Sequence, residues 1–218
     1  MKKFLMYGGV GLVVVVVGFA GVVAMQPAHA HIERSTTIAA PVADVFPFAN
    51  DYKLFMAWNP WNQLDPDQKV TFSDNPAGVG AWYAWEGDEN VGRGKMTITD
   101  VVPDQKVVSD LAFYEPFEAN AVVTMTMAAD GPGTKVTWGY DTENNFMAKA
   151  AGLFMDMDAM LGADFERGLG MLKPAAEKAS AERMAREEAA AAAAAEAAAA
   201  EGAVAADAGG EAGQAPPQ

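Results

Sequence analysis

Hydrophobic side chains follow three different patterns along the 218 residues of the chain. The first pattern is an uninterrupted apolar run, because no residue from Phe4 to Met25 is charged, and Lys2 and Lys3 precede it. A helix needs about 20 apolar residues to cross the hydrocarbon core of a bilayer, and basic residues on a short flank keep that flank in the cytoplasm. The run therefore predicts one transmembrane helix that anchors an exported domain.

A cleaved signal peptide is the alternative interpretation of this segment. Ala28, His29 and Ala30 fit the small-x-small pattern of a cleavage site, and Pro27 would break the helix just before it. The apolar core of a signal peptide is usually about 7–15 residues long, so the greater length favours an anchor over secretion after cleavage near Ala30. Both interpretations make the domain extracytoplasmic, and the absence of organelle signals favours a bacterial inner membrane and a periplasmic domain.

The second pattern is an alternation of apolar and polar residues, which predicts an antiparallel sheet. A first strand is expected over 31–38, followed by two short helices over 41–46 and 50–58. Six further strands are expected between turns rich in Gly, Pro, Asn and Asp, over 70–73, 80–86, 91–101, 107–114, 117–128 and 134–142. No long helix interrupts these strands, so hairpins rather than βαβ crossovers connect them.

The third pattern begins at Phe146, where apolar residues start to recur every three or four positions as far as Leu172. This spacing predicts one amphipathic helix over 146–172. A single apolar stripe implies that the helix lies across the concave face of the sheet and closes the domain.

Beyond Pro174 the sequence becomes rich in alanine and low in complexity. Alanine has the highest helix propensity, but this segment has no stripe of bulky apolar residues, so we expect a solvated, partly helical extension. The expected organisation is an anchor or signal peptide at 1–30, a globular domain at 31–174 and an alanine-rich tail at 175–218.

Charge and composition exclude several classes of function. The formal net charge of -14 repels polyanions, so no nucleic acid is expected as a partner. The chain has no cysteine, and its two histidines, His29 and His31, adjoin the apolar run. Beyond His31 the domain therefore lacks the residues for thiol or imidazole catalysis and for common metal sites, and we predict no catalytic residue, no metal and no cofactor. Among the carboxylates, Glu86 falls on the strand face opposite to Tyr83 and Trp85, so it does not share the aromatic face of its strand.

The order of a strand, two short helices, six strands and a long helix is the helix-grip arrangement. Along it the sequence resembles the START/polyketide cyclase-like superfamily, also described as SRPBCC or Bet v1-like. The segments that carry the resemblance are 38–46 (IAAPVADVF), 50–52 (NDY), 58–61 (WNPW), 78–81 (GVGA) and 131–138 (GPGTKVTW). The resemblance covers residues 32–173 and implies an α+β fold in which a curved antiparallel sheet wraps a long C-terminal helix.

The resemblance also implies a cavity between the sheet and the helix, which in different members holds sterols, lipids, aromatic polyketides or hormones. Bulky apolar residues on the inward faces of the strands and the helix agree with such a site. The expected ligand-binding residues are Tyr83, Trp85, Met96, Ile98, Leu111, Phe113, Met125, Trp138, Tyr140, Met157 and Leu161. A solid core would use the same residues, so this alternative stays open.

These observations predict a membrane-tethered, non-catalytic binding domain for a hydrophobic or lipid-like small molecule. One alternative is a structural protein with a solid core whose surface or tail binds an envelope protein. The other is a cyclase- or aromatase-like enzyme, which would need a buried carboxylate with a raised pKa.

Overall fold

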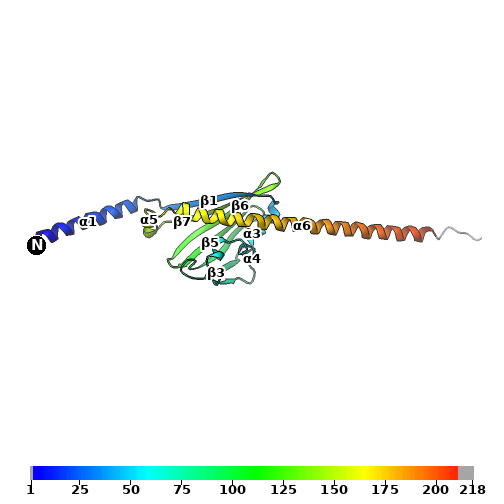
Figure 1. Ribbon diagram of the computed structural model, residues 1–218, viewed down its shortest axis with the longest axis horizontal. Helices are drawn as coiled ribbons and strands as arrows, with labels where there is room; N and C mark the ends of the chain where they lie inside the picture. The colour runs from blue at the N-terminus through cyan, green and yellow to red at the C-terminus, as the bar shows by residue number, and fades with distance from the viewer. Residues whose placement is uncertain (1, 211–218) are drawn as a thin grey trace, which may run out of the picture.

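The strands form one curved antiparallel sheet, and a long helix crosses its concave face (Figure 1). The computed structural model describes residues 2–210, and the side chains of residue 12 and residues 14–199. The sheet has seven strands in the order β1-β7-β6-β5-β4-β3-β2. They are β1 (His29–Ile38), β2 (Lys69–Phe72), β3 (Trp82–Glu86), β4 (Arg93–Val102), β5 (Lys106–Glu115), β6 (Ala119–Asp130) and β7 (Gly133–Glu143). Each predicted strand is found, with its ends shifted by no more than two residues.

The segment between β1 and β2 is divided more finely than the sequence predicted. It contains α2 (Val42–Val45), α3 (Pro47–Asn50), α4 (Tyr52–Phe55) and the 3-10 helix η1 (Pro60–Gln63). The second short helix was expected over 50–58, with Asn50 and Asp51 as its capping residues. The cap is confirmed, because Asp51 is extended and its side chain accepts from the Lys53 amide at 2.8 Å, but the length is wrong, because α4 ends at Phe55. Asn59 caps η1 in the same way, through the Trp61 amide at 3.1 Å.

The expected continuous helix over 146–172 is also wrong, because the chain forms α5 (Phe146–Ala151) and α6 (Met157–Gly210) instead. Each helix starts at an acceptor side chain. Asn145 accepts from the Ala148 amide at 2.9 Å, and Asp156 accepts from the Ala159 amide at 3.0 Å. α6 continues through Pro174, which removes one backbone donor, because the surrounding alanine-rich sequence strongly favours helix.

Polar contacts fasten α6 to β1 and α2. Near β1, the Arg34 guanidinium lies 3.0 Å from Asp158 and 3.1 Å from Glu166. Near α2, the Asp44 carboxylate accepts from Ser180 and from Arg183, each at 2.6 Å. From residue 185 to residue 199 the α6 side chains are exposed, and Figure 1 shows this part projecting from the domain as a rod.

Helix α1 (Lys2–Ala24) lies at the end of the domain opposite to the projecting part of α6 (Figure 1). The linker after it is held by Asn144, whose amide donates to the Ala28 carbonyl at 2.7 Å and whose side chain donates to the Pro27 carbonyl at 3.2 Å.

Among the helices in the described part of the chain, none has the combination of length and apolar character that crossing a membrane requires. The anchor and the alternative signal peptide therefore stay predictions. Residue 1 and residues 211–218, at the two ends of the predicted anchor and tail, lie outside the described residues.

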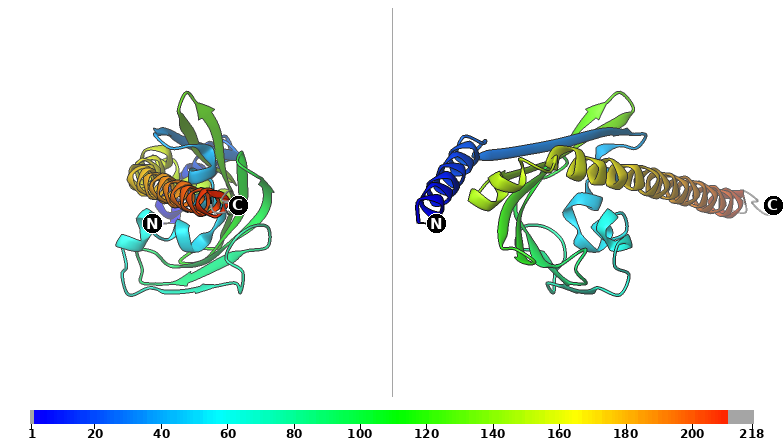
Figure 2. Two further views of the ribbon diagram at one scale, coloured as in Figure 1. Left: turned by 90° about the vertical axis from the view of Figure 1, so that its right-hand side faces the viewer. Right: turned by 60° about the vertical axis from the view of Figure 1, so that its left-hand side comes forward.

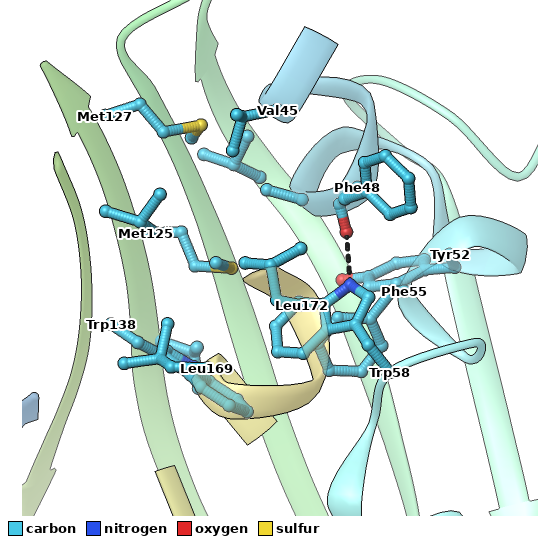
Figure 3. Packing of buried hydrophobic residues seen from close by; sticks show 14 of the residues in the cluster. Val45, Phe48, Tyr52, Phe55, Trp58, Met125, Met127, Trp138, Leu169 and Leu172 are labelled. Atoms are coloured by element: carbon cyan, nitrogen blue, oxygen red, sulfur yellow. Dashed lines mark hydrogen bonds between the residues drawn. The ribbon is translucent and has the colours of Figure 1, made fainter. Parts of the chain in front are cut away.

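The solid part of the core lies where α2, α3 and α4 fill the space between the sheet and α6 (Figure 3). Two buried polar groups are paired within it: the Trp58 indole donates to the Phe48 carbonyl at 3.0 Å, and the Tyr52 hydroxyl donates to Ser109 Oγ at 3.0 Å. We call this region the packed half, and its members are Val45, Phe48, Tyr52, Ile98, Val107, Met125, Met127, Val136, Leu172 and Ala176.

Candidate ligand cavity

A cavity of about 240 Å³ lies between the sheet and the first turns of α6. Its walls are mostly aromatic and aliphatic. The lining residues are Phe55, Asn59, Trp61, Asn62, Gln68, Tyr83, Trp85, Asn90, Val91, Met96, Leu111, Phe113, Val123, Trp138, Tyr140, Met157, Leu161 and Phe165.

The cavity occupies one end of the inner face of the sheet rather than its whole length. On β4 Met96 lines the cavity whereas Ile98, two residues further, belongs to the packed half. On β6 the same division falls between Val123 and Met125. Alternate residues of a strand share a face, so the division marks a position along the strands and not a change of face.

Strand pairing brings the ends of all seven strands together at the cavity. His29 pairs with Glu143, Glu115 with Arg93, and Arg93 with Glu86. We call this the mouth end, because exposed residues at this end, such as Asn90 in the β3–β4 loop and Met157 at the start of α6, line the cavity. The opposite end, which includes Ile38, Asp130 and Trp82, is the far end.

All but two of the residues predicted to bind ligand lie around this cavity. The exceptions are Ile98 and Met125, which point inward as predicted but lie in the packed half. Conversely, sequence reasoning missed lining residues that come from irregular segments or from positions not selected on the strands and helix. These are Phe55, Asn59, Trp61, Asn62, Gln68, Asn90, Val91, Val123 and Phe165. The aromatic and amide side chains of the 58–61 segment were the available signal for part of this group.

One wall of the cavity is a cluster of aromatic rings around Trp138. The Trp138 ring stacks on Phe165 from α6, with centroids 4.3 Å apart and an interplanar angle of 5°. Trp58 and Trp61 contact the same ring edge-on, at centroid distances of 5.1 and 5.8 Å. Gly168 allows α6 to approach, because a Cβ atom there would lie 2.8 Å from Trp138 Cζ3. The Trp138 N–H is buried without an oxygen or nitrogen acceptor and is left among aromatic rings.

The opposite wall is formed by Trp85, which lies over Gly94 on the neighbouring strand. The Trp85 indole donates to the Val91 carbonyl at 3.0 Å, and its ring meets Phe113 edge-on at 5.5 Å between centroids. A Cβ atom added at Gly94 would overlap the Trp85 ring. The absence of a side chain at Gly94 therefore fixes how far Trp85 extends into the cavity.

The polar groups of the lining are neutral and mostly paired with one another. Gln68 donates to the Asn62 side chain at 3.1 Å, and Asn62 donates to the Met56 carbonyl at 2.6 Å. Burial raises the pKa of the Tyr83 hydroxyl far above its ordinary range, and burial also raises the pKa of Tyr140. Both phenols therefore stay protonated near neutral pH. The lining contains no Asp, Glu, His, Lys or Arg.

Charged and metal-ligating groups lie outside the cavity. Glu86 is exposed on the opposite side of its strand from Tyr83, as predicted. His31 lies on the surface, with Nδ1 2.7 Å from Asp141 and Nε2 3.5 Å from Glu33, and hydrogen bonding to Asp141 raises its pKa. In the part of the chain that the structure describes, no cluster of His, Asp and Glu is arranged to hold a metal ion.

The ion pairs of Arg34 with Asp158 and Glu166 also hold in place the part of α6 that lines the cavity. Gly162 allows the guanidinium to lie close against the α6 backbone, where a Cβ atom would overlap it. The same guanidinium donates to the Asp158 carbonyl at 3.2 Å as well as to its carboxylate. These contacts hold the first turns of α6, and with them Met157 and Leu161, against β1.

The fold and the site define a class of protein: a helix-grip α+β domain with an apolar, uncharged internal cavity. A protein-family model described as polyketide cyclase / dehydrase and lipid transport matches residues 29–177, and the chain belongs to this family. No curated protein matches the sequence.

Solved structures resemble the domain at low sequence identity. A protein from Chromobacterium violaceum is 13% identical with a TM-score of 0.51, and the match covers 67% of this chain and 96% of that one. A protein from Rhizobium leguminosarum is 18% identical with a TM-score of 0.49, covering 69% and 95%. Aha1 from Colwellia psychrerythraea is 16% identical with a TM-score of 0.49, covering 68% and 96%. The first of these supports the fold alone.

Proposed function

We propose that this protein is a binding domain for a hydrophobic or lipid-like small molecule, and that it does not alter the molecule chemically. The observation that carries the proposal is the cavity, whose walls are aromatic and aliphatic and carry no charged group. Sites for small ligands are typically concave and apolar with a few polar groups that fix orientation, and Tyr83, Tyr140 and the amides near Asn62 are of that kind.

The size of the cavity restricts the ligand. The volume is about 240 Å³, whereas an apolar protein cavity of roughly 150 Å³ holds benzene and many ligand pockets have about 300–1,000 Å³. A compact ring system or a short acyl segment fits within such a space. A larger lipid would leave part of its length outside the mouth end.

The absence of a charged group from the lining favours binding over catalysis. The cyclase-like alternative requires a buried carboxylate, but the lining offers only two tyrosine hydroxyls and amide groups. The presence of a cavity favours ligand binding over the other alternative, a structural protein with a solid core that binds an envelope protein.

We further propose that the N-terminal segment tethers this domain to the outer side of a bacterial inner membrane, so that the domain is periplasmic. The support is the sequence from Phe4 to Met25, which has no charged residue and follows Lys2 and Lys3. A tether would concentrate the binding domain where an apolar ligand partitions.

A fluorescent hydrophobic probe tests the binding proposal. The full chain in a neutral detergent is titrated with N-phenyl-1-naphthylamine, tryptophan is excited, and energy transfer to the naphthyl group is recorded. We expect saturable transfer, because Trp85 and Trp138 line the cavity. Leu111→Trp should abolish saturation by filling the space. Val79→Trp adds the same chromophore at an exposed far-end position and should leave saturation unchanged. Saturation that is equal in both variants would overturn the proposal.

A further inference from the structure

Large apolar side chains are exposed around the mouth end of the domain. Phe117 lies in the turn between β5 and β6, and the others lie in α5, between α5 and α6, or at the first residue of α6. We call this set the apolar rim, and its members are Phe117, Phe146, Met147, Phe154, Met155 and Met157. Phe117 and Phe154 are each 79% exposed.

The described turns at the far end carry no comparable surface. In its described turns, 73–81, 103–105 and 131–132, Val79 is the sole large apolar side chain that is exposed. Single exposed apolar residues are common on soluble proteins, but a set of them around one opening marks an interaction surface. The rim adjoins the cavity, since Met157 belongs both to the rim and to the cavity lining.

The uncharged N-terminal segment reaches the domain beside this rim. α1 contacts α5, and Asn144, next to α5, binds the carbonyls of Pro27 and Ala28. Figure 1 shows α1 and α5 together at the same end of the domain. The described part of α1 exposes apolar side chains such as Val14 and Val17. A lipid surface that receives the N-terminal segment would therefore lie against the rim.

The charges beside the rim select the kind of lipid surface. The segments that carry the rim residues, 115–119 and 143–156, are mostly acidic. They contain Glu118, Glu143 and Asp156 but a single lysine, Lys149. A further acid, Glu115, is paired with Arg93 at 2.9 Å. Together with the net charge of -14, the acidic residues oppose binding to anionic lipid and also oppose pairing with a second copy of the chain. Insertion of the rim must therefore rest on apolar contact.

We infer that the apolar rim inserts into a membrane surface of zwitterionic lipid, so that the cavity opens directly toward the bilayer. This inference rests on the proposed function, because a membrane-facing mouth matters when the cavity takes up a hydrophobic ligand. The ligand then passes between bilayer and cavity without crossing water. Amphipathic elements of this kind bury their apolar face about 5–10 Å into the interfacial region.

Labelling with a fluorophore tests the inference on the full chain. The sequence has no cysteine, so each single-cysteine variant carries one label. Phe117→Cys, Phe154→Cys and the far-end control Val79→Cys are labelled with a polarity-sensitive fluorophore and reconstituted into phosphatidylcholine vesicles whose acyl chains carry a quencher. We expect blue-shifted, quenched emission from both rim labels and unquenched emission from the control.

The outcomes separate this inference from the proposed function. Rim labels that stay as unquenched as the control would overturn the inference, and so would quenching that appears only when phosphatidylglycerol is added. Unquenched rim labels together with saturable naphthyl binding would remove the rim inference alone. Quenched rim labels without naphthyl binding would remove the binding function and leave the membrane contact.

Discussion

The two halves of the interior use the same sheet and the same helix, yet one is solid and the other is hollow. In the packed half, α2 to α4 insert side chains such as Val45 and Phe48 between the sheet and α6 (Figure 3). In the cavity half, η1 and loops cover the space without filling it, and Figure 2 shows α2 to α4 gathered on one side of the domain. The alternation of residues decides which side chains face inward, whereas the short helices decide where the interior is filled.

Loss of the Trp138 ring, which lies where the two halves meet, should destabilise the fold most. Trp138→Ala removes the ring that stacks on Phe165 and should lower the free energy of unfolding by about 3–5 kcal/mol, the usual cost of truncating a buried aromatic residue. Urea unfolding followed by circular dichroism measures this change. Trp138→Phe keeps an aromatic ring and should cost clearly less. Equal losses in both variants would contradict the role of stacking.

The same substitution on two turns of α6 compares the halves directly. Leu172 is 1% exposed in the packed half, so Leu172→Ala should cost about 2–5 kcal/mol through lost burial and a new void. Leu161 already borders the cavity, so Leu161→Ala should cost less than about 2 kcal/mol. Comparison of the two urea midpoints checks this. A Leu161→Ala cost equal to that of Leu172→Ala would mean that the cavity half is packed in solution.

Filling the hollow from the strand side should affect binding more than stability. Gly94→Ala displaces the Trp85 ring, which would otherwise overlap the new Cβ atom, and overpacking of this kind costs about 1–3 kcal/mol. Because Trp85 lines the cavity, naphthyl binding should weaken as well. Gly170→Ala on α6 is the control, since a Cβ atom there meets no neighbour. Unchanged naphthyl binding in Gly94→Ala would contradict the assigned position of Trp85.

Acid should weaken the attachment of α6 in the packed half. Hydrogen bonds from Arg183 and Ser180 hold the pKa of Asp44 below its ordinary value, so this carboxylate stabilises the fold above about pH 4 and loses its effect as pH falls through the lowered pKa. Asp44→Asn should cost about 1–3 kcal/mol at pH 7 and progressively less below pH 4. Unfolding at several pH values measures this. A cost that is constant with pH would rule out the ion pair as its cause.

The smallest expected effect is that of shortening the projecting rod. The described side chains of 188–199 are exposed, and removal of surface segments without packing changes stability by less than about 0.5 kcal/mol. Deletion of 190–218 should therefore leave the thermal midpoint and naphthyl binding unchanged. A large drop in either would show that the rod contributes to the domain.

Local pattern predicted the strands and half of the residues that line the cavity, because alternation and turn residues act over a few positions. The sequence also placed Tyr83 and Trp85 inward and Glu86 outward, as the structure has them. The pattern could not place Ile98 and Met125 outside the cavity, since the point along the strands at which the interior becomes filled depends on how α2 to α4 pack.

The helical errors have a local explanation. The apolar spacing from Phe146 to Leu172 continues through the break between α5 and α6, so periodicity alone does not reveal the break. The available signal was the pair Asn145 and Asp156, which are typical N-cap residues and precede the two helices. The helix was expected to reach only Leu172, but α6 continues through Pro174, because a proline removes one hydrogen bond whereas the following residues gain alanine propensity and the burial of Ala176 and Ser180.

Native mass spectrometry of the full chain, released gently from the membrane of the cells that produce it, would detect a molecule that the cavity holds. We expect a reproducible non-covalent adduct on the wild-type protein, of a mass suited to a compact hydrophobic molecule or a lipid, and its loss from Leu111→Trp but not from Val79→Trp. A wild-type protein that is always bare, or an adduct that Leu111→Trp retains, would contradict the assignment of this cavity as a ligand site.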